Sequence, residues 1–396
     1  PLLLAGHGVR LAGAAKDFMT LAERMQIPVA TTWNALDILH WEHPLCVGRP
    51  GVVALRGANF AVQNCDLLIS IGCRLDNIIT AYNPHGFAHT AKKVVVDIDA
   101  NEIAKLDMDI DLSIVADAKK LLASIAQQAQ PQKPLATAPW IARCADWKRR
   151  YPVNDGLPFP SRGPISHYHF ASILSEAIPP NTLVSTGSSG LAVEVFYTIF
   201  RNKTGQRVFL TSGLGSMGYG LPAAIGSCLS NGRKPMVAVE SDGSLQLNLQ
   251  ELGTLVAQNL PITLIIMNNG GYSSIRNTQR NYFDGRFVGT GPEAGLHLPE
   301  PEQLAKAYKL PYLRVDDACG LLDQLTFALS IAGPAIIDVH LTPNETLMPK
   351  AAALPQTDGS MLSMPLEDMS PLLSLEQLEA EMLVPLSPVS RSARQK

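Results

Sequence analysis

Two polar residues, Asp242 and Asn269, follow consecutive apolar runs and carry oxygen atoms that could bind a metal ion. Asp242 stands in Ser-Asp-Gly-Ser after the run MVAVE, and Asn269 stands in Asn-Asn-Gly-Gly after the run ITLIIM. One carboxylate, one amide oxygen and spare backbone carbonyls form a hard oxygen site, which suits Mg²⁺. Because a single carboxylate leaves a divalent ion with positive charge to spare, such a site also suits an anionic diphosphate.

The residues between these two motifs are typical of one β-α-β unit. Leucine and valine recur there at helical spacing, and Pro261 ends that helix before the second apolar run. Asp242 and Asn269 are therefore expected at the carboxyl ends of parallel strands, the edge at which open α/β sheets bind ligands. Gly243 and Ser244 open the helix, whose N-terminal amides favour phosphate. Each motif alone is usually an ordinary cap or loop, so only their combination favours a metal site.

The composition indicates a large buried core and disfavours several classes of partner. Of the 396 residues, 46% are hydrophobic and 17% are charged, and the net charge is −3 without long runs of like charge. We therefore expect no nucleic-acid partner, and no membrane span because no apolar run reaches about 18 residues. The six cysteines show no CxxC pattern, which predicts reduced core residues in a cytoplasmic protein.

Alternating strand and helix patterns predict an α/β protein with two doubly wound, mainly parallel sheets. The first domain is expected at 1–130, with strands such as PLLLAG and KKVVVDID and helices such as AAKDFMTLAERMQ. Prolines predict a linker at 131–163, interrupted by a short helix at WIARCADWKRR. The second domain is expected at 164–345. The segment 346–396 contains one expected helix, SLEQLEAEM, and ends in an expected frayed tail, SPVSRSARQK.

The metal motifs resemble those of the thiamine-diphosphate-dependent enzymes. The diphosphate-binding domains of that family carry Gly-Asp-Gly and, further along, Asn-Asn, which match residues 241–243 and 268–269 here. The resemblance implies that Asp242, the side chain of Asn269 and the backbone carbonyl of Gly271 bind Mg²⁺. Serine replaces the first glycine of the family motif, outside this ligand set.

Two further segments resemble the acetolactate synthase branch of the family. In TSGLGSMGYGLPAAIG, the resemblance implies that Gly215 lets the backbone approach the aminopyrimidine and that Met217 holds the cofactor in a bent form. Alternatively, Met217 is a soft core residue that fills a gap. In VSTGSSG, the resemblance implies that Thr186, Gly187 and Ser188 face the phosphates, although loops of this composition are common.

The first domain resembles the central domain of the same branch, which binds FAD in acetolactate synthases. Several relatives keep this domain without FAD, and GHGVRLAG does not match the G-x-G-x-x-G fingerprint. The sequence therefore leaves open whether the domain binds FAD or is only structural. By analogy, five residues are candidate FAD contacts: Gly6, Gly8, Arg74, Asp97 and Asp99.

The resemblance implies an enzyme that uses thiamine diphosphate and Mg²⁺ to decarboxylate a 2-keto acid such as pyruvate and to join the product to a second carbonyl. Acetolactate synthases do this in branched-chain amino acid biosynthesis. Relatives assemble active sites between subunits, so the resemblance implies a homodimer or homotetramer. In the family an activating glutamate lies in an N-terminal pyrimidine-binding domain, for which we find no candidate here. We therefore expect the sequence to be a fragment that binds thiamine diphosphate weakly, or not at all, by itself.

Three alternatives remain open: a 2-keto acid decarboxylase or lyase, a sugar-branching carboligase, and a non-catalytic paralogue. The segment after Asn-Asn departs from true acetolactate synthases, so the second carbonyl is not identified. Arginines of that segment, Arg276 among them, either contact an anionic substrate or pair on a solvated face.

Overall fold

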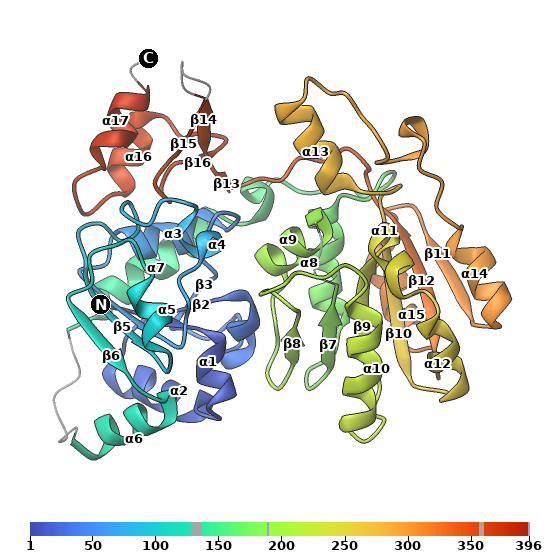
Figure 1. The fold of residues 1–396 in the computed structure, drawn as a ribbon, viewed down its shortest axis with the longest axis horizontal. Coiled ribbons are helices and arrows are strands. Elements are labelled where there is room, and N and C mark those ends of the chain that lie inside the picture. The colour runs from blue at the N-terminus through green and yellow to red at the C-terminus, as the bar shows by residue number, and fades with distance from the viewer. Residues whose placement is uncertain (129–135, 188–189, 356–359, 395–396) are drawn as a thin grey trace. The chain divides into compact units, whose positions relative to one another are not determined.

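The computed structural model describes residues 1–128, 136–187, 190–355 and 360–394. The chain forms two compact units (Figure 1). The first unit comprises Pro1–Gly156 together with Met348–Lys396, and the second comprises Leu157–Leu347. The C-terminal segment therefore packs with the first unit, although it follows the second in the sequence.

The first unit is built on a six-stranded sheet in the order β3-β2-β1-β4-β5-β6, and every pairing in it is parallel. Its strands are β1 (Leu2–Ala5), β2 (Val29–Thr31), β3 (Cys46–Gly48), β4 (Leu67–Ile71), β5 (Lys92–Asp97) and β6 (Leu112–Val115). Its helices before the second unit are α1 (His7–Leu11), α2 (Ala15–Met25), η1 (Trp33–Ile38), α3 (Arg56–Gln63), α4 (Asn77–Thr80), α5 (Ala100–Ala104), α6 (Ala118–Gln128), α7 (Ala138–Arg150) and η2 (Val153–Gly156).

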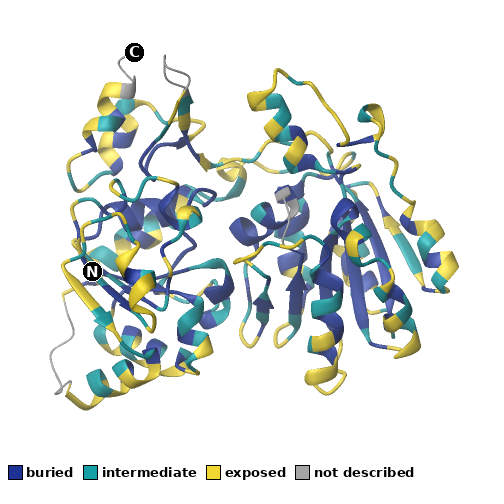
Figure 2. Cartoon of the chain, in the orientation of Figure 1, coloured by how far each residue is buried: buried dark blue, intermediate teal, exposed yellow. Residues whose placement is uncertain are grey.

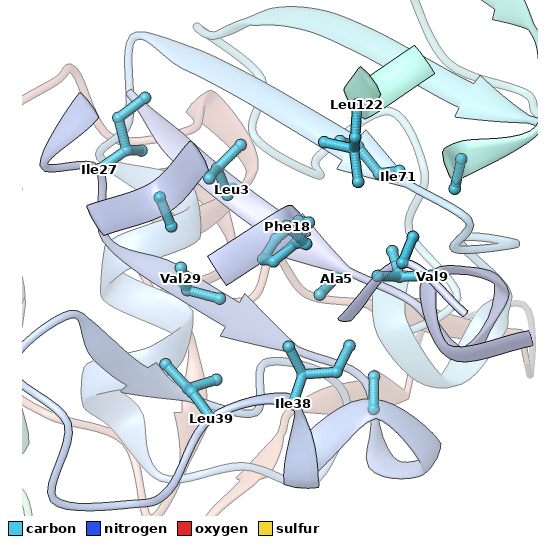
Figure 3. Packing of buried hydrophobic residues seen from close by; sticks show 14 of the residues in the cluster. Leu3, Ala5, Val9, Phe18, Ile27, Val29, Ile38, Leu39, Ile71 and Leu122 are labelled. Atoms are coloured by element: carbon cyan, nitrogen blue, oxygen red, sulfur yellow. The ribbon is translucent and has the colours of Figure 1, made fainter. Parts of the chain in front are cut away.

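Helices pack on this sheet through large apolar side chains. Phe18 of α2 is fully buried in a cluster with Leu3 of β1, Ile71 of β4 and Leu122 of α6 (Figure 3). Strand β1 is buried along its whole length, which explains why its sequence is continuously apolar rather than alternating.

The C-terminal segment closes the first unit. It forms β13 (Lys350–Ala351), β14 (Ala353–Pro355), β15 (Met361–Ser363), β16 (Met369–Ser370), α16 (Leu375–Glu381) and α17 (Pro388–Arg394). The expectation of a frayed tail was therefore wrong for the described residues. Ser390 of α17 is fully buried and its hydroxyl donates to Glu367, a long-range contact that the local sequence does not reveal.

Glu381, at the end of α16, ties the C-terminal segment to α7. Its carboxylate accepts hydrogen bonds from Arg150 (2.5 and 2.6 Å), Trp147 (2.8 Å) and Tyr151 (2.8 Å). Burial raises the pKa of Glu381, but these hydrogen bonds outweigh burial and hold the pKa at about 2. A lowered folded-state pKa means that the ionised carboxylate stabilises the folded protein above its ordinary pKa, and that this stabilisation is lost as pH falls toward 2.

We expect Glu381→Gln to lower the free energy of unfolding at neutral pH by about 3 kcal/mol, as for a broken buried ion pair. The difference from wild type should shrink as pH falls from about 4.5 toward about 2, because wild-type Glu381 is then also neutral. Urea titrations followed by circular dichroism across this range measure both effects. Glu376→Gln on the exposed side of the same helix is the control and should change stability by less than about 0.5 kcal/mol. A pH-independent difference would contradict the prediction.

The second unit is built on another six-stranded sheet, in the order β11-β12-β10-β9-β7-β8, again with parallel pairings throughout. Its strands are β7 (Leu183–Thr186), β8 (Arg207–Phe209), β9 (Met236–Ser241), β10 (Ile262–Asn268), β11 (Tyr312–Val315) and β12 (Ala335–His340). Its helices are α8 (His167–Ala177), α9 (Gly190–Ile199), α10 (Gly220–Ser230), α11 (Asp242–Leu245), η3 (Gln246–Asn248), α12 (Glu251–Ala257), α13 (Ser273–Tyr282), η4 (Pro292–Ala294), α14 (Pro301–Tyr308) and α15 (Leu321–Leu329).

The central strands β9 and β10 are buried along nearly their whole length (Figure 2). The expected doubly wound, mainly parallel α/β fold is thus confirmed for both units. Within the described residues, no helix is both long enough and apolar enough to cross a membrane. The cysteines are all free, and Cys319 is exposed whereas most of the others are buried.

Candidate metal and diphosphate site

The parallel pairing of β9 with β10 places Asp242 and Asn269 at the same edge of the second sheet. Ser241, the last residue of β9, pairs with Met267 of β10, so each polar residue follows the end of its strand. The Asp242 carboxylate accepts a 2.7 Å hydrogen bond from the backbone N–H of Gly271. The aspartate after one strand thus contacts the loop after the next, as the β-α-β pattern predicted.

Asp242 and Asn269 each keep one side-chain oxygen without a partner. Both residues are buried, with exposed fractions of 5% and 3%. The Oδ1 atom of each has no hydrogen-bond partner among the residues that the structure describes. An unsatisfied buried polar atom costs about 1–3 kcal/mol, so these two atoms favour a ligand that binds oxygen.

The charge of Asp242 also favours a cation. Burial raises the pKa of Asp242 to about 6, although hydrogen bonds from the backbone of Gly271 and Gly243 oppose the shift. A bound cation would offset the cost of the buried negative charge. The described residues contain no cluster of three His, Cys, Asp or Glu side chains that could hold a metal. One carboxylate, one amide and backbone carbonyls therefore fit Mg²⁺ better than a metal that prefers nitrogen or sulfur ligands.

The loop after β10 requires glycine at two positions. Gly270 and Gly271 adopt φ angles of 72° and 120°, a region that side chains disfavour. A Cβ atom on Gly271 would also lie only 2.5 Å from the carbonyl oxygen of Thr290. The Asn-Asn-Gly-Gly sequence is thus needed for the backbone conformation that brings Gly271 to Asp242.

Arg276 of α13 fixes the backbone of this loop through hydrogen bonds. It is buried, with an exposed fraction of 8%, which rules out the solvated face, one of the two alternatives for this residue. Its guanidinium donates to the carbonyl oxygens of Asn269 (2.6 Å), Gly270 (3.0 Å), Thr290 (2.6 Å) and Pro343 (2.9 Å). The positive charge of Arg276 therefore interacts with backbone carbonyl dipoles of the loop that contacts the buried Asp242.

The loop after β7 begins beside β9, where the backbone N–H of Gly187 donates to the carbonyl oxygen of Val239 (2.7 Å). Thr186 is the last residue of β7, the strand that pairs with β9, and Gly187 follows it. The Thr186 hydroxyl lies 2.9 Å from the Gly187 carbonyl oxygen. Gly187 packs on the buried carboxylate of Glu240, since a Cβ atom there would lie 2.0 Å from Glu240 Oε1. The same carboxylate accepts a hydrogen bond from Gly220 at the start of α10 (2.8 Å). Ser188, the remaining residue expected in this loop, lies outside the described residues.

Ser244, which follows β9 and Asp242, contacts the glycine-rich segment before α10. The Ser244 hydroxyl accepts a 2.7 Å hydrogen bond from the backbone N–H of Gly218. Met217, the preceding residue, is half-buried, and Gly215 has a φ of 67°, which glycine allows. The segments of Gly215, Met217 and Ser244 are thus brought together.

The helix expected to start at Gly243 is interrupted. It consists of the short helix α11, the 3-10 turn η3 and the helix α12. A Cβ atom on Gly243 would lie 2.5 Å from the ring of Tyr272, so glycine there lets the turn after β9 pack against the loop after β10. Phosphate binding at this turn would depend on single backbone amides more than on a long helix.

Sequence reasoning missed His167, which contacts Asn269, and Glu345, which contacts His167. His167, the first residue of α8, places its Nε2 atom 3.4 Å from Nδ2 of Asn269. Its Nδ1 atom lies 2.9 Å from Glu345, which follows β12. His167 is 102 positions from Asn269 and 178 positions from Glu345, so no local motif could have identified these contacts.

The candidate FAD residues of the first unit are only partly brought together. A cavity of about 190 Å³ at the carboxyl ends of β1, β4, β5 and β6 is lined by Gly8 and Asp97. Arg74 instead pairs with Asp76 (3.2 Å), and Asp99 caps α5 by accepting from the backbone of Asn101 (2.8 Å). These two residues do not line the cavity.

The glycines after β1 serve the packing of two loops. A Cβ atom on Gly6 would lie 2.0 Å from the carbonyl oxygen of Gly72, and one on Gly8 would lie 2.8 Å from the Cα atom of Gly72. Both glycines therefore allow the loop after β1 to pack against the loop after β4. This requirement explains their presence whether or not a nucleotide binds.

Comparison with known proteins identifies both units. Residues 1–125 match the central domain of thiamine pyrophosphate enzymes, and residues 186–339 match their C-terminal TPP binding domain; thiamine pyrophosphate (TPP) is another name for thiamine diphosphate. Over 358 residues the chain is 33% identical to an acetolactate synthase of Arthrospira platensis, covering 89% of this chain and 60% of that protein. It is 30% identical over 359 residues to a probable acetolactate synthase large subunit of Methanocaldococcus jannaschii, covering 88% and 58%.

The chain thus spans less than two thirds of the length of these relatives, and the match runs through both of its units. The chain belongs to the thiamine pyrophosphate enzyme family, of which it carries the central domain and the C-terminal TPP binding domain.

Proposed function

We propose that the second unit binds Mg²⁺ through Asp242, Asn269 and the backbone carbonyl of Gly271, and that this ion holds the diphosphate of thiamine diphosphate. The observation that carries the proposal is the pair of buried Oδ1 atoms on Asp242 and Asn269 that have no partner among the described residues. Both belong to residues that follow adjacent parallel strands, and the match to a TPP binding domain names the cofactor class.

The surrounding residues have distinct proposed roles toward that cofactor. Gly187 and Gly243 let backbone approach the diphosphate, Ser244 holds the glycine-rich segment in place, and Met217 supports the bent cofactor beside Gly215. Thr186 and Ser188 complete the loop that faces the phosphates. Thiamine diphosphate, when bound, supplies an electron sink for cleaving and forming carbon–carbon bonds.

The reaction we propose is that of the acetolactate synthases: decarboxylation of a 2-keto acid such as pyruvate, followed by ligation to a second carbonyl. The names of the relatives support this reaction type. The residues of this chain contribute cofactor binding, orientation and exclusion of water. We also propose a cytoplasmic homodimer or homotetramer, which exposed apolar residues such as Tyr282 and Phe283 support.

Incubation of the full-length protein with pyruvate, Mg²⁺ and thiamine diphosphate is expected to yield acetolactate rather than free acetaldehyde. Product analysis by NMR separates this carboligase activity from that of a simple decarboxylase. The same reaction without Mg²⁺ is the control and should give no product. Release of acetaldehyde alone would favour the decarboxylase, and turnover of neither type with bound cofactor would favour a non-catalytic paralogue.

FAD is the second cofactor to consider, and the cavity lined by Gly8 and Asp97 supports it. At about 190 Å³, this cavity is smaller than the roughly 300–1,000 Å³ typical of small-molecule sites. Within the first unit it therefore fits one part of a dinucleotide. Flavin released from the purified, heat-denatured protein would support an FAD site, whereas a colourless extract would favour a structural domain.

A further inference from the structure

We propose that His167 and Glu345 are positioning residues that fix the side-chain amide of Asn269 with its oxygen facing the metal site. The inference rests on the proposed function, because it concerns how a proposed Mg²⁺ ligand is oriented. It adds two residues that neither the metal motifs nor the match to a TPP binding domain assigns a role.

The first step is the contact between Glu345 and His167. One carboxylate oxygen of Glu345 accepts from the backbone N–H of His167 (2.7 Å) and lies 2.9 Å from its ring Nδ1 atom. Burial raises the pKa of Glu345, but hydrogen bonds from His167 and Ser166 outweigh burial and lower it below its usual range. An ionised carboxylate only accepts hydrogen bonds, so the Nδ1 atom of His167 carries a hydrogen.

The second step is the contact between His167 and Asn269. An amide nitrogen only donates hydrogen bonds, so the Nε2 atom of His167 that faces it accepts, which places the ring hydrogen on Nδ1 beside Glu345. The Nε2 atom lies 3.4 Å from Nδ2 of Asn269, the donor end of the amide. Because His167 is fully buried, water does not compete for this contact. The contact with His167 therefore selects one of the two possible orientations of the amide.

The third step is the consequence for the other end of the amide. Arg276 already fixes the backbone of Asn269 through its carbonyl oxygen (2.6 Å), so rotation of the side chain is the main freedom left. With Nδ2 held by His167, Oδ1 is the atom that stays buried and has no partner in the part of the chain that the structure describes. A flipped amide would present hydrogens to the cation, whereas the observed orientation presents the oxygen that Mg²⁺ requires.

Outer-shell partners of this kind typically account for about 10–100-fold in metal affinity. We therefore expect His167→Leu, which removes the acceptor, to weaken Mg²⁺ binding by at least about 10-fold. His167→Gln, whose amide oxygen can still accept, should weaken it less. Calorimetric titration of the full-length protein with Mg²⁺, in the presence of thiamine diphosphate, measures both effects.

A double-mutant cycle separates orientation from general damage to the fold. In an Asn269→Asp background the two side-chain oxygens are equivalent, so there is no amide left to orient. The effect of His167→Leu on Mg²⁺ affinity should therefore largely disappear in that background. Melting curves recorded without Mg²⁺ report any loss of stability separately from affinity.

Two results would overturn the proposal. One is an equal loss of Mg²⁺ affinity from His167→Leu in the wild-type and Asn269→Asp backgrounds. The other is unchanged Mg²⁺ affinity in the His167→Leu variant. If His167→Leu does not fold, Glu345→Ala carries the test: weaker Mg²⁺ binding supports the proposal and unchanged binding contradicts it. Failure of the wild-type protein to bind Mg²⁺ with thiamine diphosphate would instead overturn the proposed function.

Discussion

Asp242→Ala should weaken the Mg²⁺-dependent binding of thiamine diphosphate by more than about 100-fold, because outer-shell partners alone account for about 10–100-fold. The substitution removes the only carboxylate that we assign to the ion. It also removes the acceptor for the Gly271 backbone N–H, so the loop that supplies the other two proposed ligands loses its link to the turn after β9. Calorimetry with and without Mg²⁺ measures the loss.

Without Mg²⁺, the Asp242→Ala substitution should destabilise the folded protein only through the lost hydrogen bond from Gly271. Burial raises the pKa of Asp242 to about 6, which shows that the ionised side chain is unfavourable in the metal-free fold. Asp317→Ala is a suitable control, since this aspartate of the same unit accepts from backbone N–H groups of Gly163 and Cys319. It should lower stability without changing Mg²⁺ affinity. Wild-type affinity in Asp242→Ala would refute the assignment of the metal site.

The edge of the sheet where Asp242 and Asn269 lie could be predicted because its determinants are local. Continuous apolar runs identify strands buried on both faces, and a helix between two such runs implies a parallel pair with both carboxyl ends at one edge. The glycines at positions 270 and 271 are likewise explained by the φ angles of their own loop. For these features, a short window of sequence contains most of the physical cause.

The support behind the site could not be predicted, because its causes are tertiary. Arg276 is in a strongly polar helix, and polarity predicts a solvated side chain. It is buried because four backbone carbonyls from three segments of the chain converge on it. His167 reaches Asn269, and Glu345 reaches His167, because Ile165 just before α8 bridges Leu341 just after β12, and β12 pairs with β10.

The packing role of Gly187 also could not be predicted from the sequence. The sequence motif indicates a phosphate-facing loop, but the structure adds a second requirement, the close approach of the buried Glu240 carboxylate. Such contacts depend on the pairing of β7 with β9, which the sequence does not specify. A glycine in a motif can therefore have both a ligand-binding and a packing cause.

Arg276→Met is expected to lower the free energy of unfolding by about 3 kcal/mol or more, because hydrogen bonds to charged groups contribute about 1.5–3 kcal/mol each. The carbonyl oxygens of Asn269, Gly270 and Pro343 each lose a charged donor at once. Methionine fills much of the volume but donates no hydrogen bond. Urea-induced unfolding without Mg²⁺ measures the effect.

Binding of Mg²⁺ should weaken in the same variant by about 10-fold or more, in the range found for outer-shell partners, because the loop that carries Asn269 and Gly271 is no longer fixed. Arg276→Lys should lie between wild type and Arg276→Met, since an ammonium group keeps the charge but cannot span several carbonyls as the planar guanidinium does. Arg280→Met, one turn further along α13, is the matched control. Arg280 contacts side-chain oxygens of Asn277 and Asn344, so its loss should change stability by less than about 1 kcal/mol and leave Mg²⁺ affinity unchanged. If Arg276→Met and Arg280→Met behaved alike in both measurements, the loop would not depend on the buried guanidinium, and its glycine conformation alone would have to place the metal ligands.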